Sequence, residues 1–119
     1  MTIEQTIVKF FEVFNSRDLD LMGDLLLPDA EFYFPKTQPL IGKDRILRFL
    51  SILFRQYPEL EFEVQRVICQ ENKAAVHWTN RGHNRRKEFY HNEGVTILEL
   101  QADKIKFISD FFKDTEKFW

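Results

Sequence analysis

Asp110 is the residue whose neighbours in the sequence best suit chemistry. It stands between Ile108 and Phe112, and Phe111 follows it directly. Side chains two residues apart share one face of a β-strand, so Ile108, Asp110 and Phe112 would lie together. Apolar surroundings disfavour a charged carboxylate and raise its pKa toward the range used in acid–base catalysis. The alternative is a structural carboxylate held by tyrosine, threonine or backbone donors, or one at a pocket rim.

His77 is the second candidate for proton transfer, because a neutral imidazole beside a carboxylate is a common acid–base pair. It lies in the run Val76, His77, Trp78 and Thr79. Simple alternation places Val76 and Trp78 inward and leaves His77 on the outer face of a sheet. A cavity shared with Asp110 would make a dehydratase or a cyclase conceivable, whereas opposite faces would favour a binding module.

Length and composition indicate one globular domain over residues 1–119. A chain of 119 residues has the size of a single domain and is long enough to fold without disulfides or structural metal. Its residues are 44% hydrophobic and 30% charged, an ordinary globular mixture. Thirteen phenylalanines, three tyrosines and two tryptophans can build either a thick core or an apolar pocket.

The charge balance and the cysteine count exclude several classes of partner. Seventeen basic and 19 acidic residues give a formal net charge of −2, so no basic field is present to bind nucleic acid. No apolar run is long enough to cross a membrane, and the N-terminus lacks a signal-peptide pattern. Cys69 is the single cysteine, and no His and Cys cluster has metal-ligand spacing. We therefore expect a cytoplasmic protein without a metal or an organic cofactor.

Three helices are predicted in the first half of the chain. A capping-box pattern at residues 2–5 opens a helix that runs to Phe14, with apolar residues every three or four positions. A short second helix covers residues 19–26 and is stopped by Pro28. A third helix, with a wide apolar stripe, covers residues 43–57.

Strands follow the helices, with one strand between the second helix and the third. Alternating apolar and aromatic residues predict strands over residues 30–34, 61–69, 74–79, 89–100 and 105–114. The alternation slips at Val67, as it does at a β-bulge. Hairpins join the last four strands, and the polar stretch that ends at Lys87 forms the widest of these turns.

This order of elements predicts an α+β fold. We expect a cone-shaped barrel of a strongly bent, mostly antiparallel sheet, with the three helices of the N-terminal half on its concave face. Such an interior holds a ligand where side chains do not fill it, because an apolar concavity with a few polar groups is the usual form of a small-molecule site.

Four stretches of the chain carry a resemblance to a known family. They are residues 10–20 (FFEVFNSRDLD), residues 27–32 (LPDAEF), the helix start at 41–44 (IGKD) and the final strand pair over 94–112. They resemble the nuclear transport factor two-like superfamily and, within it, the SnoaL-like polyketide cyclase and ketosteroid isomerase-like group. The fold hosts isomerases, cyclases, dehydratases, hydrolases and binding modules, so the resemblance does not fix an activity.

The resemblance implies where isomerase chemistry would stand, and this chain differs there. Phe34 takes the position of the general base, Phe10 that of the oxyanion-hole tyrosine, and Thr96 that of the protonated aspartate. A phenyl ring neither accepts nor donates a proton, so ketosteroid isomerase activity is not expected. These positions instead become pocket wall.

Near the end of the chain, Asp110 matches a polar residue that members of the family carry at this position. Residues 109–114 (SDFFKD) are similar to the Arg-Asp-Tyr-Phe-Asp ending of limonene epoxide hydrolases and some SnoaL-like proteins, which implies that Asp110 points into the cavity as an acid or a base. Comparison with the isomerase-like strand implies that His77 lies inside, so its facing stays open. The stretch from His77 to Arg81 lacks the Arg and Asp pair that epoxide hydrolysis needs, so that reaction is not expected.

We therefore expect a pocket bounded by the first helix, the third helix and the inner sheet face. Its lining would be Phe10, Phe14, Phe34, Phe54, Tyr57, Trp78, Thr96 and Phe112. The ligand would be a small apolar molecule, isomerised, cyclised or dehydrated with Asp110 as proton carrier. The alternative is a non-catalytic protein-interaction or dimerisation module in which the aromatic residues are simply core.

Three further surfaces carry expectations about partners. The last strand is half apolar on both faces, which favours a homodimer through the outer sheet face. Residues 81–87 hold four basic side chains that could bind a phosphate or a carboxylate, unless the loop is simply a solvated hairpin tip. Phe118 and Trp119 would be exposed apolar surface unless they pack on a dimer partner or close the cavity, so they are a secondary indication of an interface.

Overall fold

The computed structural model describes residues 1–116. Phe118 and Trp119 lie outside the described residues. Within that range the elements, in chain order, are α1 (Ile3–Ser16), α2 (Leu19–Leu25), β1 (Leu26–Tyr33), β2 (Leu40–Ile41), α3 (Lys43–Gln56), β3 (Glu59–Gln70), β4 (Lys73–His83), β5 (Phe89–Gln101) and β6 (Lys104–Phe112).

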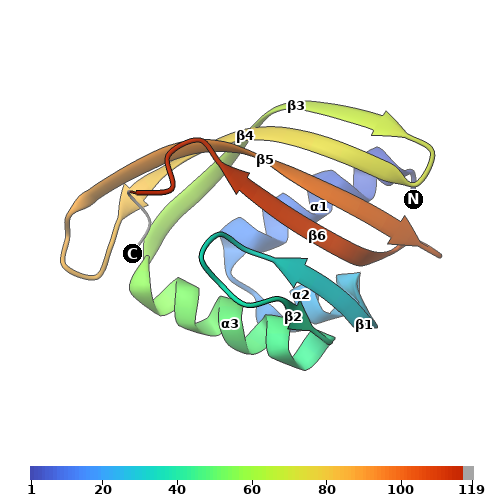
Figure 1. Ribbon diagram of the computed structural model, residues 1–119, viewed down its shortest axis with the longest axis horizontal. Coiled ribbons are helices and arrows are strands. Elements are labelled where there is room, and N and C mark those ends of the chain that lie inside the picture. Colours follow the sequence, from blue (N-terminus) through green and yellow to red (C-terminus); the bar gives the residue numbers. More distant parts are fainter. Residues whose placement is uncertain (117–119) are drawn as a thin grey trace.

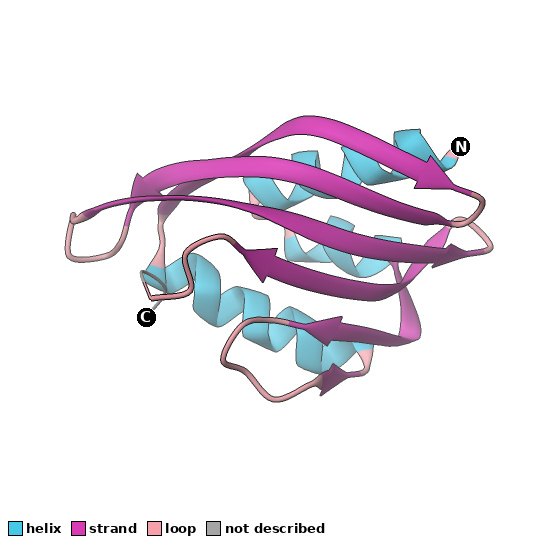
Figure 2. Ribbon diagram, turned by 45° about the horizontal axis from the view of Figure 1, so that its top comes forward, coloured by secondary structure: helices cyan, strands magenta, loops and turns pink. Residues whose placement is uncertain are grey.

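The strands form one bent sheet that the three helices cover on one face (Figures 1 and 2). The strand order is β2-β1-β6-β5-β4-β3, and every pair is antiparallel except β1 with β6. The predicted α+β cone is confirmed. The sheet is open, because its two edge strands, β2 and β3, do not pair with each other.

Both ends of α1 show why the helix forms where it does. Thr2 and Gln5 make the predicted capping box, with reciprocal bonds between side chain and backbone. The helix runs two residues past the predicted end at Phe14. It stops at Arg17, whose φ of 64° is left-handed and whose N–H bonds back to the last turn.

Two polar side chains at this helix end fasten α1 to its neighbours. The amide of Asn15 donates to the Phe62 carbonyl and accepts from the Phe62 N–H, both at 2.8 Å, as a paired strand residue would. The guanidinium of Arg17 donates to the carbonyls of Phe54 and Leu60 at 3.1 Å. The helix therefore has a fixed position over β3.

The first strand begins earlier than its pattern predicts. β1 starts at Leu26, so Pro28 lies inside a strand instead of stopping a helix. A proline lacks the N–H that a sheet ladder needs, and the register between β1 and β6 is broken between Leu26 and Glu31, where Pro28 stands. The two-residue strand β2, which pairs with β1 over Glu31 and Phe32, was not predicted.

The long hairpin of β3 and β4 also departs from its predicted limits. The bulge lies between Val64 and Arg66 instead of at Val67. β4 continues to His83, four residues past its predicted end, and stays paired there because Gly82 lets the strands approach closely. A Cβ atom at Gly82 would lie 1.3 Å from the Glu59 carbonyl oxygen, so this position accepts glycine alone.

Candidate functional site

Asp110 lies on the inner face of the sheet, which the helices cover. In β6 the side chains of Ile108 and Phe112 are buried on the same face, as alternation predicts. The cross-strand partner of Asp110 is Thr96 of β5, which is 2% exposed. The parallel pairing of β6 with β1 reaches Ser109, so Asp110 is the first residue of β6 beyond it. The Asp110 side chain keeps intermediate exposure.

A chain of two hydrogen bonds joins three strands at this point. The indole Nε1 of Trp78 in β4 donates to Thr96 Oγ1 at 2.8 Å. Thr96 Oγ1 in turn bonds Asp110 Oδ1 at 2.6 Å. Trp78 is fully buried, and Thr96 is nearly so. The arrangement sets a carboxyl group at the end of a buried polar chain.

Burial dominates the ionisation of Asp110. Loss of hydration disfavours the carboxylate and raises the pKa of Asp110 from 3.8 to about 7, while the hydrogen bond from Thr96 opposes that rise. The acid and the carboxylate are therefore both populated near neutral pH. A group in that state can donate a proton to a bound molecule or accept one from it.

The predicted pocket residues pack against one another. Phe10, Phe14, Phe34, Tyr57, Trp78, Thr96 and Phe112 are all buried, and Phe54 is half-buried. Their rings form a continuous series of contacts, with centroid distances from 4.8 to 6.2 Å along Phe10, Phe14, Phe62, Trp78, Phe112 and Phe34. In this conformation the aromatic side chains contact one another where the apolar pocket was expected.

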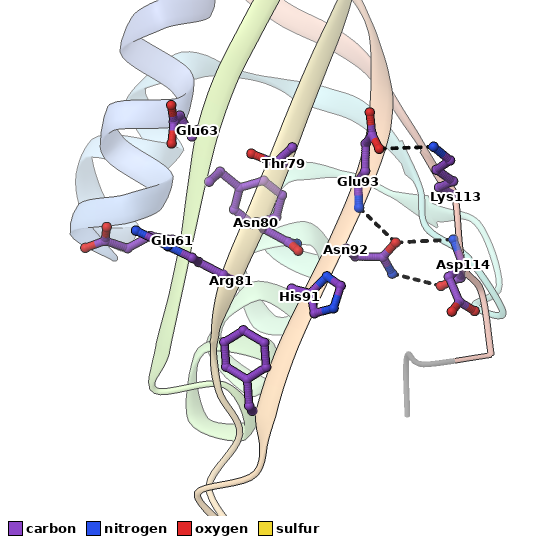
Figure 3. Close-up of a pocket in the computed structure, with 12 residues that line it drawn as sticks. Glu61, Glu63, Thr79, Asn80, Arg81, His91, Asn92, Glu93, Lys113 and Asp114 are labelled. Carbon is purple, nitrogen blue, oxygen red and sulfur yellow. Dashed lines mark hydrogen bonds and ion pairs between the residues drawn. The ribbon is translucent and has the colours of Figure 1, made fainter.

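Five pockets formed by residues 1–116 lie away from Asp110. Their volumes are between about 340 and 600 Å³, and none of the five is lined by Asp110. The largest, about 600 Å³, is an open groove that holds Glu61, Glu63, Arg81 and Lys113 (Figure 3). Its lining is mostly the outer face of the sheet and is strongly charged. It is not the expected apolar pocket.

His77 lies on the outer face of the sheet and does not meet Asp110. Its Nε2 bonds Glu93 of β5 at 2.5 Å, and Lys113 reaches the other oxygen of the same carboxylate at 3.2 Å. The bond with His77 is the largest cause that holds the pKa of Glu93 below its usual value. Simple alternation was the correct guide to this strand, and the comparison with the isomerase-like strand was not. Of the two facings left open for His77, the structure has the one in which His77 and Asp110 do not share a cavity.

Asn80 is a polar interior residue that the sequence analysis missed. It is 3% exposed, and neither its Nδ2 nor its Oδ1 has a hydrogen-bond partner. Its cross-strand neighbour Asn92 is satisfied, with bonds to Glu93 and Asp114 (Figure 3) and a further one to the Tyr90 hydroxyl. The sequence did contain a signal, because Asn80 stands two residues after Trp78 and therefore shares its face of the strand. A buried amide without partners is costly and suited to hydrogen-bonding a guest.

The basic loop is an exposed hairpin tip. Arg81 lies in β4, whereas Arg85, Arg86 and Lys87 stand in the turn between β4 and β5, and all four are exposed. Asn84 Oδ1 accepts from two backbone N–H groups of the loop, at 2.9 and 3.0 Å, so the turn is held by its own residues. The solvated-tip interpretation describes this geometry.

Residues 1–116 contain neither a candidate metal site nor a candidate membrane-spanning helix. No group of three or more His, Cys, Asp or Glu side chains there is placed to hold a metal ion. No helix in that range has the length and apolar character that a membrane span requires.

The family assignment rests on a match over most of the chain. The family model of the SnoaL-like domain matches residues 7–108. The chain belongs to the SnoaL-like family. Members of this family have the nuclear transport factor two-like fold, which confirms the resemblance stated above. A search of curated proteins finds no match to this SnoaL-like chain.

Solved structures show the same fold for this SnoaL-like protein. An NTF2-like protein of unknown function from Burkholderia pseudomallei is 20% identical, with a TM-score of 0.89 over 98% of this chain and 94% of that one. A candidate SnoaL-like polyketide cyclase from Jannaschia sp. is 17% identical, with a TM-score of 0.85 over 93% and 85%. TerC, co-crystallised with polyporic acid, is 20% identical, with a TM-score of 0.87 over 98% and 94%. At these identities the likeness establishes the fold alone.

Proposed function

We propose that this protein binds a small, largely apolar molecule between its helices and the inner sheet face, and isomerises, cyclises or dehydrates it with Asp110 as proton carrier. One observation carries the proposal. A carboxyl group on the inner face, hydrogen-bonded by Thr96, has a pKa raised to about 7 by burial. Acid–base catalysis is most efficient when the pKa of the catalytic group lies near the working pH.

Asn80 supports the same proposal from a second position on the inner face. Its amide offers one acceptor and two donors that no described group uses. A carbonyl or hydroxyl group on an otherwise apolar ligand would satisfy it. A hydrocarbon without such a group would leave the amide unpaired, so the site should discriminate between the two.

Entry of a ligand requires the aromatic rings to move. Phe112 follows Asp110 by two residues on the same face, and its ring contacts Phe34 at 5.3 Å between centroids. Phe34 directly follows β1 and begins the loop before β2. Rotation of these two rings would open space beside the carboxyl group.

The relatives support a small organic ligand. One structural neighbour is a candidate polyketide cyclase, and another was crystallised with polyporic acid. We propose that this chain takes a molecule of comparable size and not a polymer.

The test is a melting-temperature screen with small apolar molecules that carry a carbonyl or a hydroxyl group. A ligand that binds only the folded state adds about 2.7 kcal/mol to the free energy of unfolding when its concentration is a hundred times Kd. The melting temperature rises as a result. We expect a rise with the oxygenated ligand and a smaller one with its hydrocarbon analogue. Asp110→Asn should keep the binding and lose turnover. A panel without any shift would refute ligand binding, and unchanged turnover in Asp110→Asn would refute the role of that residue.

A second candidate function is a dimerisation module without catalysis. The packed interior favours it, and so does the outer sheet face, where Phe111 is 59% exposed and Ile68 65% exposed. Val95, Ile97 and Phe107 add half-buried apolar surface to that face. The partner proposed here is a second copy of this chain.

A further inference from the structure

The direction of the buried hydrogen-bond chain follows from the chemistry of its members. An indole nitrogen donates and never accepts, so Trp78 must donate to Thr96. The threonine hydroxyl has a single proton and cannot direct it at the indole N–H. That proton therefore points along the other bond, to Oδ1 of Asp110.

This direction leaves one oxygen of Asp110 for the acidic proton. Oδ1 is engaged as an acceptor from Thr96, so it is the poorer place for a proton. We propose that Trp78 and Thr96 are positioning residues that hold Asp110 with its acidic proton on Oδ2. The catalytic meaning of this arrangement rests on the proposed function, since it matters to turnover only if Asp110 transfers protons.

The proposal changes what two predicted ligand-binding residues do. The polar atoms of Thr96 and Trp78 are already hydrogen-bonded to each other and to Asp110. These atoms are therefore not available to bind a ligand. A ligand must then present a carbonyl or hydroxyl oxygen to Oδ2. That requirement narrows the substrate class from any apolar molecule to one with such an oxygen.

No charged group contributes to the shift in the pKa of Asp110, which burial raises and the hydrogen bond from Thr96 lowers. The same-face residues of β6, Ile108 and Phe112, and the buried residues of α1, α2 and α3 carry no charge. Thr96 is flanked on the inner face of β5 by Gly94 and Leu98, which are also uncharged. Among the buried side chains of residues 1–116, the ionisable ones are the tyrosines Tyr57 and Tyr90. The titration midpoint of Asp110 therefore depends on its burial and on the hydrogen bond from Thr96.

The test is an NMR titration of the Asp110 carboxyl carbon in the full chain, with no ligand present. We expect a midpoint near pH 7 in the wild type. Thr96→Val removes the bond that stabilises the carboxylate, so its midpoint should rise, by about one pH unit. Thr96→Ser keeps the hydroxyl and should restore the wild-type midpoint. A midpoint in Thr96→Val that stays or falls would overturn the role of Thr96.

The indole N–H resonance of Trp78 is a second measurement, which does not depend on whether Thr96→Val folds. Because hydrogen bonds in a chain polarise one another, this resonance should move with the Asp110 midpoint in the wild type. In Asp110→Asn, whose amide nitrogen takes the place of protonated Oδ2, the resonance should stay at its low-pH position at every pH. An indole N–H shift that does not change as Asp110 titrates would overturn the proposal, and so would a shift that stays at the high-pH value in Asp110→Asn.

Failure of this proposal differs from failure of the proposed function. The titration uses the free protein, so its outcome does not depend on a ligand. Suppose that the melting-temperature screen finds no ligand and that the NMR titration gives the expected midpoints. The positioning of Asp110 would then be supported, and its catalytic role would be refuted. A ligand that binds and is turned over, together with a midpoint in Thr96→Val that equals the wild-type value, would refute the role of Thr96 and leave the proposed function intact.

Discussion

The indole of Trp78 lies directly over Gly94 of the neighbouring strand. A Cβ atom at Gly94 would be 2.6 Å from Cζ2 of Trp78 and 2.4 Å from the carbonyl oxygen of Phe111. The missing side chain therefore sets the position of the indole on the sheet. That position brings Nε1 within hydrogen-bond distance of Thr96.

Gly94→Ala should displace the indole and destabilise the protein. Two contacts far shorter than van der Waals distance would have to relax, and overpacking of this kind costs about 1 to 3 kcal/mol or more. Urea denaturation measures the effect. Gly23→Ala in α2 is the matched control, because its Cβ would meet only flexible side-chain ends, Leu47 at 3.3 Å and Lys43 at 3.9 Å, and alanine favours a helix. Equal stability of the two variants would contradict the steric argument.

Asp110→Asn should remove a pH dependence of stability. The folded pKa of about 7 lies above the unfolded value of 3.8, so the folded state binds more protons between these values. The contribution of Asp110 is fully present below about pH 4 and is lost as the pH rises through 7. From pH 5 to pH 8 the wild type should lose about 2 to 3 kcal/mol of unfolding free energy relative to the variant. Urea denaturation at both pH values checks this, and parallel losses would show that Asp110 has an ordinary pKa.

Asn80→Leu should stabilise the free protein. The variant replaces an unpaired buried amide with an apolar side chain of similar size, a gain of about 1 to 3 kcal/mol. Asn92→Leu is the matched control on the adjacent strand and should destabilise, because Asn92 uses both amide atoms in bonds to Tyr90, Glu93 and Asp114. Thermal denaturation compares the two. A loss of stability in Asn80→Leu would mean that a buried water already satisfies the amide in solution.

Phe111→Lys should dissociate the proposed homodimer. A charge at the centre of an apolar interface is left without a partner when two copies associate, so the dimer should weaken by more than tenfold in Kd. Sedimentation or light scattering measures the mass. Ile52→Lys, at a 41% exposed position of α3 away from the sheet, is the control and should leave the mass unchanged. A wild type that is monomeric at high concentration would end the dimer proposal.

Much of the architecture was predictable from local patterns. The capping box at Thr2 and Gln5, the apolar stripes and the period-two alternation act between residues close in the chain, so they fixed the order of helices and strands. The limits of elements were less predictable. Pro28 lies inside β1 because the ladder is already broken there, and β4 extends to His83 because Gly82 meets the backbone of Glu59.

The candidate site divides in the same way. The inward facing of Asp110 followed from alternation with Ile108 and Phe112, since the period of a strand is a local property. The sequence alone left the phase of β4 at His77 open, because alternation placed this side chain outward and comparison with the isomerase-like strand placed it inward. Tertiary structure decided that phase, and with it the separation of His77 from Asp110.

The sequence by itself determined an α+β domain of the SnoaL-like kind with an acid on the inner face of its last strand. Only the tertiary structure decided what surrounds that acid. Trp78, Thr96 and Asp110 stand on three different strands, and the register of those strands alone brings their polar atoms within bonding distance. The same register leaves the Asn80 amide unpaired. Contacts between residues distant in the chain depend on the packing of the whole sheet, which no local pattern of residues encodes.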